Sequence, residues 1–430
     1  MAPLLSQIVH LIKSIVLRPE DTSRRSSAQF FPGKQLPFGR TSGIVISWWY
    51  SEDTFDTLDT VASLLIGTHS ELRDCDPESV SDAVMKTLQE VCINPAIFKG
   101  DALLFSKYRT LLECRAVTVP QLAAAILQEI VTNVRSLIGK RCTIFAVPRL
   151  QVTSFCLAEE SIRVIAISDS TAWQDLVNEG YQFDGWTPMH PILGPGESRT
   201  FSLPGEFECL LVAEAYGTQK GAQFNSILRF RKLAAVLFAV ASERAPYPYH
   251  KAMARPLELC VQFPHKSNPD LRVTSSSCDS VFPYYASPIP IGADEVATTQ
   301  DWYSRCLRCS EDTRSRLEKG AHFLNRGMNS SDIEAYINYF VTLDALFGER
   351  GSVESSILKG VRTLGIPDTY IEKAKWLFEL RNEIVHGGSR YITEWPKFIR
   401  YKKHFRSNPM TDVQSLAQVS VLKAPYVFAP

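Results

Sequence analysis

Several common signals are missing from this chain. No stretch of its 430 residues is apolar over the length of a bilayer, which argues against a transmembrane helix. Its charges balance, with 46 Lys and Arg against 46 Asp and Glu, so there is no overall basic charge with which to coat nucleic acid. It has no P-loop, nucleophile-elbow, HExxH or dinucleotide-binding glycine motif. The missing motifs exclude the best-known nucleotide-binding, hydrolase and zinc-protease sites. The balanced charge means that any nucleic-acid binding would depend on a local basic patch.

The ten cysteines show no framework of paired spacings, which is typical of reduced thiols in the cytoplasm. Cys306 and Cys309 form one C-x-x-C pair without a second pair to match. Structural zinc sites usually need four ligands, so neighbouring helix positions are the favoured interpretation and zinc is the alternative. Residues 1–16 lack the basic start and continuous apolar run of an export signal, and we interpret them as a first helix. We therefore expect a cytoplasmic protein without a metal or other cofactor, and with no membrane partner.

The order of hydrophobic patterns predicts several regions. Residues 1–140 show apolar spacing typical of helices, so this N-terminal region is expected to be mainly helical. Residues 141–297 contain short β-type segments between turns and are predicted to be mixed α/β. Residues 298–410 show closely spaced helical patterns, which predicts a helical bundle, and residues 411–430 are expected to be a tail. The predicted fold class is multidomain α+β.

The individual elements follow from the same periodicities. A basic cluster, Arg229, Arg231 and Lys232, falls inside one expected helix and is interpreted as a solvated face, since short charge runs usually are. Residues 263–290 are rich in Pro and Ser and are expected to be a loop. Helices are expected at 53–72, 77–91, 101–114, 119–138, 224–241, 301–328, 331–347, 353–364, 367–386 and 395–405, and strands at 44–49, 142–147, 162–167, 207–212 and 257–263.

The most informative stretch is the end of the helix expected at 367–386. Arg381, Asn382 and His386 are followed at once by two glycines, and Gly387 suits the left-handed stop of a helix. At ordinary residue usage Arg-x4-His with Asn after the Arg should occur about 0.01 times in such a chain. An imidazole can move a proton from a ribose 2′-hydroxyl, and a guanidinium can hold a phosphate bidentately, without a metal. A salt-bridging Arg and a capping His are the plain structural alternative.

A helical projection separates these side chains. Asn382 and His386 share a face, whereas Arg381 lies roughly 140° around the helix from His386. Arg381 falls within the apolar arc, so it is expected to face the core and to need a partner. Asp344, inside the apolar arc of the helix at 331–347, is the candidate that would orient it. A site divided in this way is expected to be completed by another surface.

Residues 395–406 alternate aromatic and basic side chains. Such a strip can contact RNA, with Lys402, Lys403 and Arg406 attracting phosphates. Phe398, Tyr401 and Phe405 also have helical spacing, which is more typical of core packing. The two interpretations are compatible.

The last quarter of the chain resembles the HEPN superfamily, particularly its ApeA-like branch. The resemblance rests on residues 337–390, including Leu343-Asp344-Ala345-Leu346-Phe347 and the run from Leu377 to Gly388. It implies an all-α bundle, commonly dimeric, whose Arg-[Asn/His/Asp]-x-x-x-His motif forms a composite, metal-independent endoribonuclease site at the dimer interface. Arg381, Asn382 and His386 match that motif. Gly388 stands where some members carry a modifiable tyrosine, which argues against that mode of control.

What the resemblance implies for function is an RNA endonuclease of a prokaryotic defence or toxin system. His386 would act as general acid or base, and Arg381 would bind the scissile phosphate. Asn382 would position either the phosphate or His386. The products would carry a 2′,3′-cyclic or free 3′-phosphate and a 5′-hydroxyl, and the N-terminal regions would recognise a trigger ligand or protein. The alternative is a non-catalytic HEPN module that mediates dimerisation, joined to a binding N-terminal region.

Overall fold

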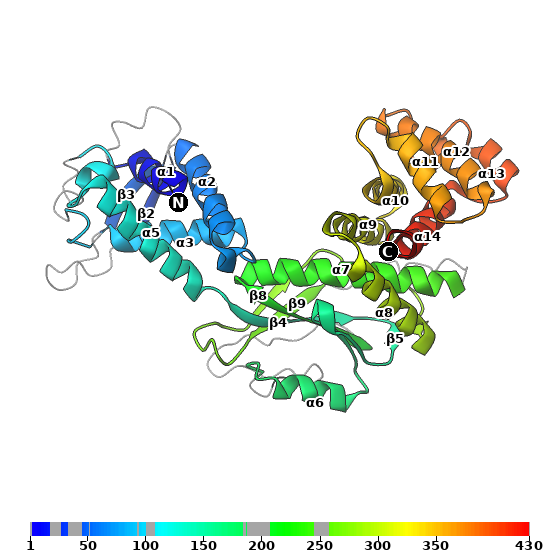
Figure 1. Cartoon of the computed structure of the whole chain (residues 1–430), viewed down its shortest axis with the longest axis horizontal. Coiled ribbons are helices and arrows are strands. Elements are labelled where there is room, and N and C mark those ends of the chain that lie inside the picture. Colours follow the sequence, from blue (N-terminus) through cyan, green and yellow to red (C-terminus); the bar gives the residue numbers. More distant parts are fainter. Residues whose placement is uncertain are drawn as a thin grey trace. The chain divides into compact units, whose positions relative to one another are not determined.

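The computed structural model describes residues 2–17, 27–32, 45–50, 52–92, 94–99, 108–183, 186, 207–244 and 258–429. Contacts divide the chain into two compact units (Figure 1). Unit 1 comprises Met1–Arg141 and Tyr216–Gln223, and unit 2 comprises Cys142–Ala215 and Phe224–Pro430. The chain is helix-rich, with a sheet in its middle part and helices at its C-terminal end.

In its described residues, unit 1 contains four helices around one apolar core. They are α1 (Ala2–Ser14), α2 (Glu52–Thr68), α3 (Pro77–Val91) and α5 (Val119–Ser136). Short 3-10 turns follow at Ser70–Leu72 and Leu111–Cys114. The core includes Leu11, Leu65, Leu88 and Ile126. An antiparallel sheet has the order β1 (Ile15–Val16), β3 (Val45–Tyr50), β2 (Ser27–Pro32). Of the helix expected at 101–114, residues 101–107 lie outside the described residues.

Local capping explains where α3 begins. The Asp76 carboxylate accepts a hydrogen bond from the Ser79 amide at 2.7 Å, and Pro77 occupies the first turn, where its missing N–H costs nothing. The Thr218 hydroxyl donates to the same carboxylate at 2.7 Å. The start of α3 is thereby anchored to the segment Tyr216–Gln223 of the same unit.

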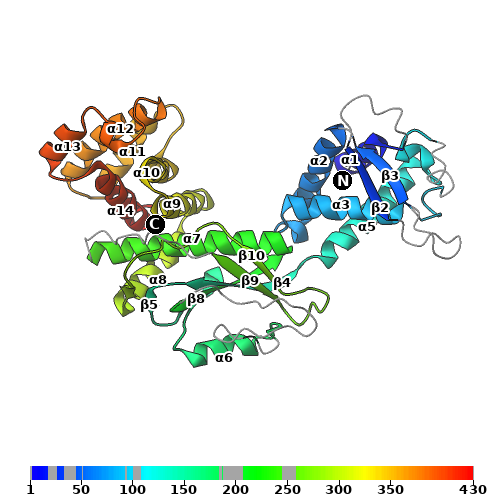
Figure 2. The ribbon, with the colours of Figure 1, turned by 180° about the vertical axis from the view of Figure 1, so that it is seen from behind.

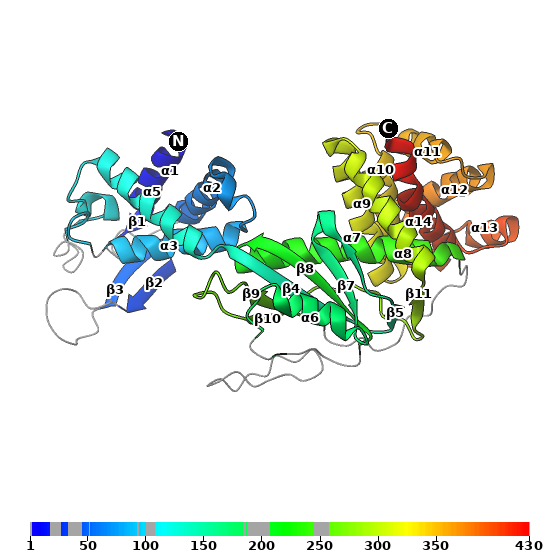
Figure 3. The ribbon, with the colours of Figure 1, turned by 60° about the horizontal axis from the view of Figure 1, so that its bottom comes forward.

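Unit 2 contains a six-stranded sheet between helices. The strand order is β10 (Thr274–Ser277), β9 (Leu259–Pro264), β4 (Gly139–Val147), β8 (Cys209–Gly217), β7 (Ile162–Ala166), β6 (Phe155–Leu157). Helix α7 (Gln219–Arg244) lies along one face and α6 (Ser170–Asn178) on the other (Figure 3). Phe230 and Leu233 of α7 join Phe145 and Leu211 in one core, while Leu176 of α6 belongs to a second core.

The expected loop at 263–290 is wrong in part. Strand β10 pairs with β9 in antiparallel fashion, and β11 (Ile289–Ile291) pairs in parallel with β5 (Leu150–Val152). β10 consists of Thr and Ser and lacks the apolar alternation that indicates a strand. β11 is only three residues long and has a proline at its centre, which is a weak strand signal. The partner of β11 lies far away in the sequence, whereas β9 and β10 are consecutive strands.

The C-terminal part of unit 2 is a bundle of helices (Figure 2). One helix was expected at 301–328, but two form, because Ser310 caps a new helix by accepting a hydrogen bond from the Thr313 amide. A short 3-10 turn, Ile392–Glu394, leads into α13. The bundle consists of α8 (Ala293–Arg308), α9 (Glu311–Asn329), α10 (Asp332–Phe347), α11 (Val353–Thr363), α12 (Asp368–Val385), α13 (Phe398–Phe405) and α14 (Pro409–Phe428).

The expected tail at 411–430 is also wrong. Most of it forms α14, which packs against α9 and α10 and buries Val413, Leu416 and Val421. Pro425 lies inside this helix and has no N–H to give to the Val421 carbonyl, four residues earlier. The indole N–H of Trp302 donates to that carbonyl instead, at 2.8 Å. The last helix is therefore an integral part of the bundle.

The basic cluster on α7 is not the solvated face that its sequence indicated. Arg231 and Lys232 are both buried. The Lys232 ammonium pairs with Glu160 at 2.8 Å and with Glu318 at 3.2 Å, and Arg231 pairs with Asp279 at 3.3 Å. Acids from distant segments compensate these charges, which periodicity alone cannot reveal. Within the described ranges, no helix has both the length and the apolar character needed to cross a membrane.

Candidate functional site

The end of α12 is set by a glycine turn. Gly387 has φ of +76°, and the amides of Gly387 and Gly388 donate to the carbonyls of Ile384 and Glu383 at 3.0 and 2.8 Å. This is the Schellman pattern, in which a left-handed residue closes a helix, as predicted for Gly387. His386 consequently sits at the C-cap, with its amide bonded to the Asn382 carbonyl at 3.0 Å.

The motif side chains lie beyond the buried part of α12. The buried residues of this helix end at Leu380, and Asn382 and His386 are exposed while Arg381 is half-buried. The Arg381 guanidinium donates through Nη1 to Asn382 Oδ1 at 3.2 Å. The expectation that Arg381 faces the core is therefore wrong.

Asp344 does not orient Arg381. Asp344 is exposed at the end of α10, and its carboxylate folds over Gly348, where an added Cβ would lie 1.9 Å from Asp344 Oδ1. Within the part of the chain that the structure describes, Asp344 and Arg381 form no ion pair. α10 contacts α12 through other residues: the Tyr336 hydroxyl donates to the Leu377 carbonyl at 2.8 Å. Asp344 and Arg381 each lie in the apolar arc of their own helix, but this did not place the two charges opposite each other.

The basic residues of α13 lie toward the opposite end of α12 from the motif. Lys397 pairs with Glu379, and His404 pairs with Glu372 at 2.9 Å, so α13 runs antiparallel to α12. The His404 ring also stacks on Trp376 with an interplanar angle of 11°. Glu372 precedes His386 by about four helical turns, or roughly 20 Å along the axis. Lys402, Lys403 and Arg406, which flank His404, are therefore not adjacent to the motif.

The aromatic residues of α13 are core residues, as one of the two interpretations predicted. Phe398 and Tyr401 are buried, and the Tyr401 hydroxyl donates to the buried Asp412 carboxylate at 2.8 Å. Lys373 of α12 pairs with the same carboxylate at 2.8 Å. Asp412 thus joins α12, α13 and α14, while Lys402, Lys403 and Arg406 remain exposed.

Exposed apolar side chains flank the motif. Val385 is 51% exposed and Tyr391 is 57% exposed, although both types are usually covered. Arg390, which directly precedes Tyr391, forms an ion pair with Glu394 at 2.8 Å. A single chain therefore presents one guanidinium, one amide and one imidazole on an accessible helix end, beside apolar side chains that it leaves uncovered.

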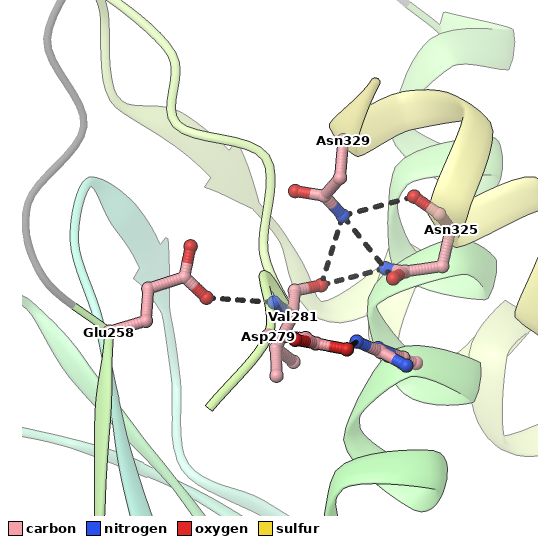
Figure 4. Close-up of polar contacts among 6 residues, drawn as sticks. Glu258, Asp279, Val281, Asn325 and Asn329 are labelled. Carbon is pink, nitrogen blue, oxygen red and sulfur yellow. Dashed lines mark hydrogen bonds and ion pairs between the residues drawn. The ribbon is translucent and has the colours of Figure 1, made fainter. Parts of the chain in front are cut away.

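The other polar centres of unit 2 are structural. Residues 279–281 are held to the sheet and to α9, as Figure 4 shows: Glu258 accepts from the Val281 amide at 2.8 Å, and Asn325 donates to the Val281 carbonyl at 2.7 Å. Asn329 donates to that carbonyl as well, at 3.4 Å. Sequence reasoning did not identify this cluster, because its members come from three distant segments.

Cys306 and Cys309 are buried near the end of α8, and burial raises the pKa of Cys306 to about 12. Burial also raises the pKa of Cys309. Such thiols stay protonated at neutral pH. Among the residues that the structure describes, no three His, Cys, Asp or Glu side chains group closely enough to hold a metal ion.

Comparison with known proteins identifies no relative: no family model matches the chain, and neither a curated protein nor a solved structure shows significant similarity to it.

Proposed function

We propose that this protein is a metal-independent endoribonuclease of the HEPN type, whose site is formed by Arg381, Asn382 and His386. The observation that carries the proposal is that all three side chains reach the surface at one helix end that a left-handed glycine turn closes. The resemblance of residues 337–390 to HEPN proteins supports the same assignment. As in the family, the protein would serve a prokaryotic defence or toxin system.

The proposed chemistry is transesterification of RNA. A base removes the proton of the ribose 2′-hydroxyl, the 2′-oxygen bonds to phosphorus, and the bond to the 5′-oxygen breaks as an acid protonates it. The products are a 2′,3′-cyclic phosphate and a 5′-hydroxyl. His386 can supply either proton-transfer role, and Arg381 can stabilise the charge that grows on the phosphate oxygens. Asn382, which already accepts a hydrogen bond from Arg381, fixes the guanidinium.

The proposed site needs two copies of the chain. Concerted transfer uses one group at the 2′-oxygen and another at the 5′-oxygen, and the motif of one chain contains one imidazole. Val385 and Tyr391 are apolar and exposed beside it. A homodimer that covers these side chains brings two His386 residues together. Lys402, Lys403 and Arg406 would then contact RNA further along the strand, at roughly 20 Å along α12 from the motif.

The test is cleavage of a labelled RNA by the purified full chain in EDTA. Arg381→Ala and His386→Ala are expected each to abolish cleavage while the thermal midpoint stays unchanged, because both side chains lie outside the core. Arg390→Ala and His404→Ala remove an exposed Arg and an exposed His outside the motif, and they should retain activity. Cleavage that needs a divalent metal, or survives both motif substitutions, would reject the proposal.

A dimerisation module without catalysis is the second candidate, which the exposed Val385 and Tyr391 favour. Val385→Lys together with Tyr391→Lys should convert a dimer into monomers, measured by light scattering after gel filtration. The nuclease proposal expects RNA cleavage to disappear with the dimer. A dimer that has no activity on any RNA, either alone or in infected cells where a trigger is present, would favour the module.

A further inference from the structure

Unit 1 contains an open groove between α2 and α3, with a volume of about 780 Å³. Its walls are stripes at helical spacing: Phe55, Leu58, Asp59 and Ser63 on α2, and Glu78, Ser81, Asp82, Met85, Lys86 and Gln89 on α3. Ser63 and Glu78 are near the connecting turn in the chain, and Thr54 and Gln89 are toward the far ends of their helices. The two helices are in contact (Figure 1). The groove runs for about 17 Å along α3, a length that fits roughly 11 residues of helix.

Apolar and aromatic side chains form part of the groove's lining. Phe55 is 49% exposed, which is unusual for a large aromatic side chain, and its ring meets the Tyr50 ring edge-on at 5.8 Å. Leu58 and Met85 line the groove beside it. Methionine adapts its shape to different partners, so it is common at surfaces that bind apolar side chains. These residues offer an anchor site to apolar side chains spaced along one face of a helix.

A buried hydroxyl in the same groove has no partner. Ser81 is 8% exposed, and no hydrogen-bonding group in the described part of the chain meets its Oγ. A buried polar group without a hydrogen bond destabilises a protein by about 1–3 kcal/mol. If the Ser81 hydroxyl, which has almost no accessible surface, rotates toward the groove, a molecule bound there would remove that cost. This hydroxyl is an observation independent of the apolar walls.

The rim is acidic. Among the described residues that line the groove, the acids are Asp59, Glu78 and Asp82, and the basic residue is Lys86. Lys220, from the segment Tyr216–Gln223 of the same unit, pairs with Glu78 at 2.6 Å, but both side chains are exposed. Exposed ion pairs contribute little to stability, so a cation from a partner can replace Lys220 beside Glu78. The rim therefore selects a basic molecule, and the walls select one with an apolar face.

We infer that this groove binds a basic amphipathic helix of a partner protein, with apolar anchors against Phe55, Leu58 and Met85 and with Lys or Arg side chains beside Asp59 and Asp82. Two helices in contact offer a third helix the ridges and grooves that helices pack into. The short connection and the Asp76–Thr218 bond hold the first turn of α3 in place, so the groove is preformed. This inference does not depend on the proposed nuclease activity.

The test uses the full chain and a fluorescent peptide of leucine and lysine, about 15 residues long, with leucines at helical spacing. A matched peptide of leucine and glutamate is the control ligand. Fluorescence anisotropy should show binding of the lysine peptide and at least about tenfold weaker binding of the glutamate peptide. Phe55→Ala should weaken binding of the lysine peptide by about tenfold or more, since aromatic anchors dominate such interfaces.

Two charge-reversed variants distinguish binding in the groove from nonspecific electrostatic attraction to the protein surface. Asp59→Lys with Asp82→Lys should invert the preference and bind the glutamate peptide, a gain that misfolding cannot produce. Asp56→Lys with Glu129→Lys makes the same change of charge on exposed residues outside the groove, and should leave the lysine peptide bound as before. Equal loss in both variants, equal binding of both peptides, or unchanged binding to Phe55→Ala would overturn the inference.

Discussion

Gly387→Ala tests whether the glycine turn positions the candidate site. Gly387 has φ of +76°, and an added Cβ would meet nothing within 4 Å, so the substitution brings backbone strain without a clash. A left-handed conformation costs a residue with a Cβ about 1–2 kcal/mol relative to glycine. In a domain the size of unit 2, that loss lowers the thermal midpoint by about 2–4 °C for each kcal/mol.

The same strain should reduce RNA cleavage. A penalty of about 1–2 kcal/mol lowers the population of the closed turn by up to about five- to thirtyfold relative to frayed forms, and His386 lies at the start of that turn. Cleavage of a labelled RNA in EDTA is expected to fall by up to this factor. Gly387→Asn should recover most of the loss, because asparagine tolerates the left-handed conformation.

Gly365→Ala is the matched control. Gly365 follows α11 with φ of +64°, and its added Cβ would also meet nothing within 4 Å. It should lose the same stability as Gly387→Ala and keep full cleavage activity. If Gly365→Ala loses as much activity, the assay reports overall stability; if Gly387→Ala loses neither stability nor activity, the reasoning about the turn is refuted.

Three further predictions concern the structure of unit 2. Trp302→Phe removes the N–H that bonds to the Val421 carbonyl and should lower stability by about 1–3 kcal/mol, measured by urea denaturation; an unchanged midpoint would contradict it. Lys232→Ala leaves the largely buried Glu160 carboxylate without its cation and should cost about 3–5 kcal/mol, while adding Glu160→Gln should recover part of that loss. Burial, with nearby Arg231 and Arg326, lowers the pKa of His322 from 6.5 to about 4. The unfolded chain therefore binds more protons at this residue between pH 6.5 and 4, and stability should fall as the pH drops through that window. His322→Gln should show a smaller fall in thermal midpoint between pH 7 and 4.5, and equal falls would reject the assignment.

Local signals in the sequence were sufficient for many elements of the fold. The bounds of α3 at Pro77–Val91 match the predicted range because a proline and a capping carboxylate act within one turn. The stop at Gly387 follows from the conformational freedom of glycine. Both signals depend on neighbours along the chain. The break between α8 and α9 was missed, although Ser310 carries a local capping signal there.

The candidate site was predictable as a set of residues but not as an arrangement. The sequence placed Arg381, Asn382 and His386 at one helix end. The structure exposes Asn382 and His386 there, whereas Arg381 is half-buried and does not face the core as expected. Asp344 was wrong as a partner because a helical projection gives the direction of a side chain around its own axis and not what lies opposite. Lys402, Lys403 and Arg406 follow the motif closely in sequence, yet the antiparallel return of α13 takes them toward the other end of α12.

The sequence by itself therefore determined the helices with local start and stop signals, the positions of β3, β4, β7, β8 and β9, and the motif with its glycine turn. The tertiary structure alone decided that Lys232 is buried between Glu160 and Glu318, that α14 belongs to the bundle, and that α2 and α3 leave a groove between them. The physical reason is range. Capping and periodicity act between residues a few positions apart, whereas burial, charge compensation and the shape of a surface depend on segments that meet only in the folded chain.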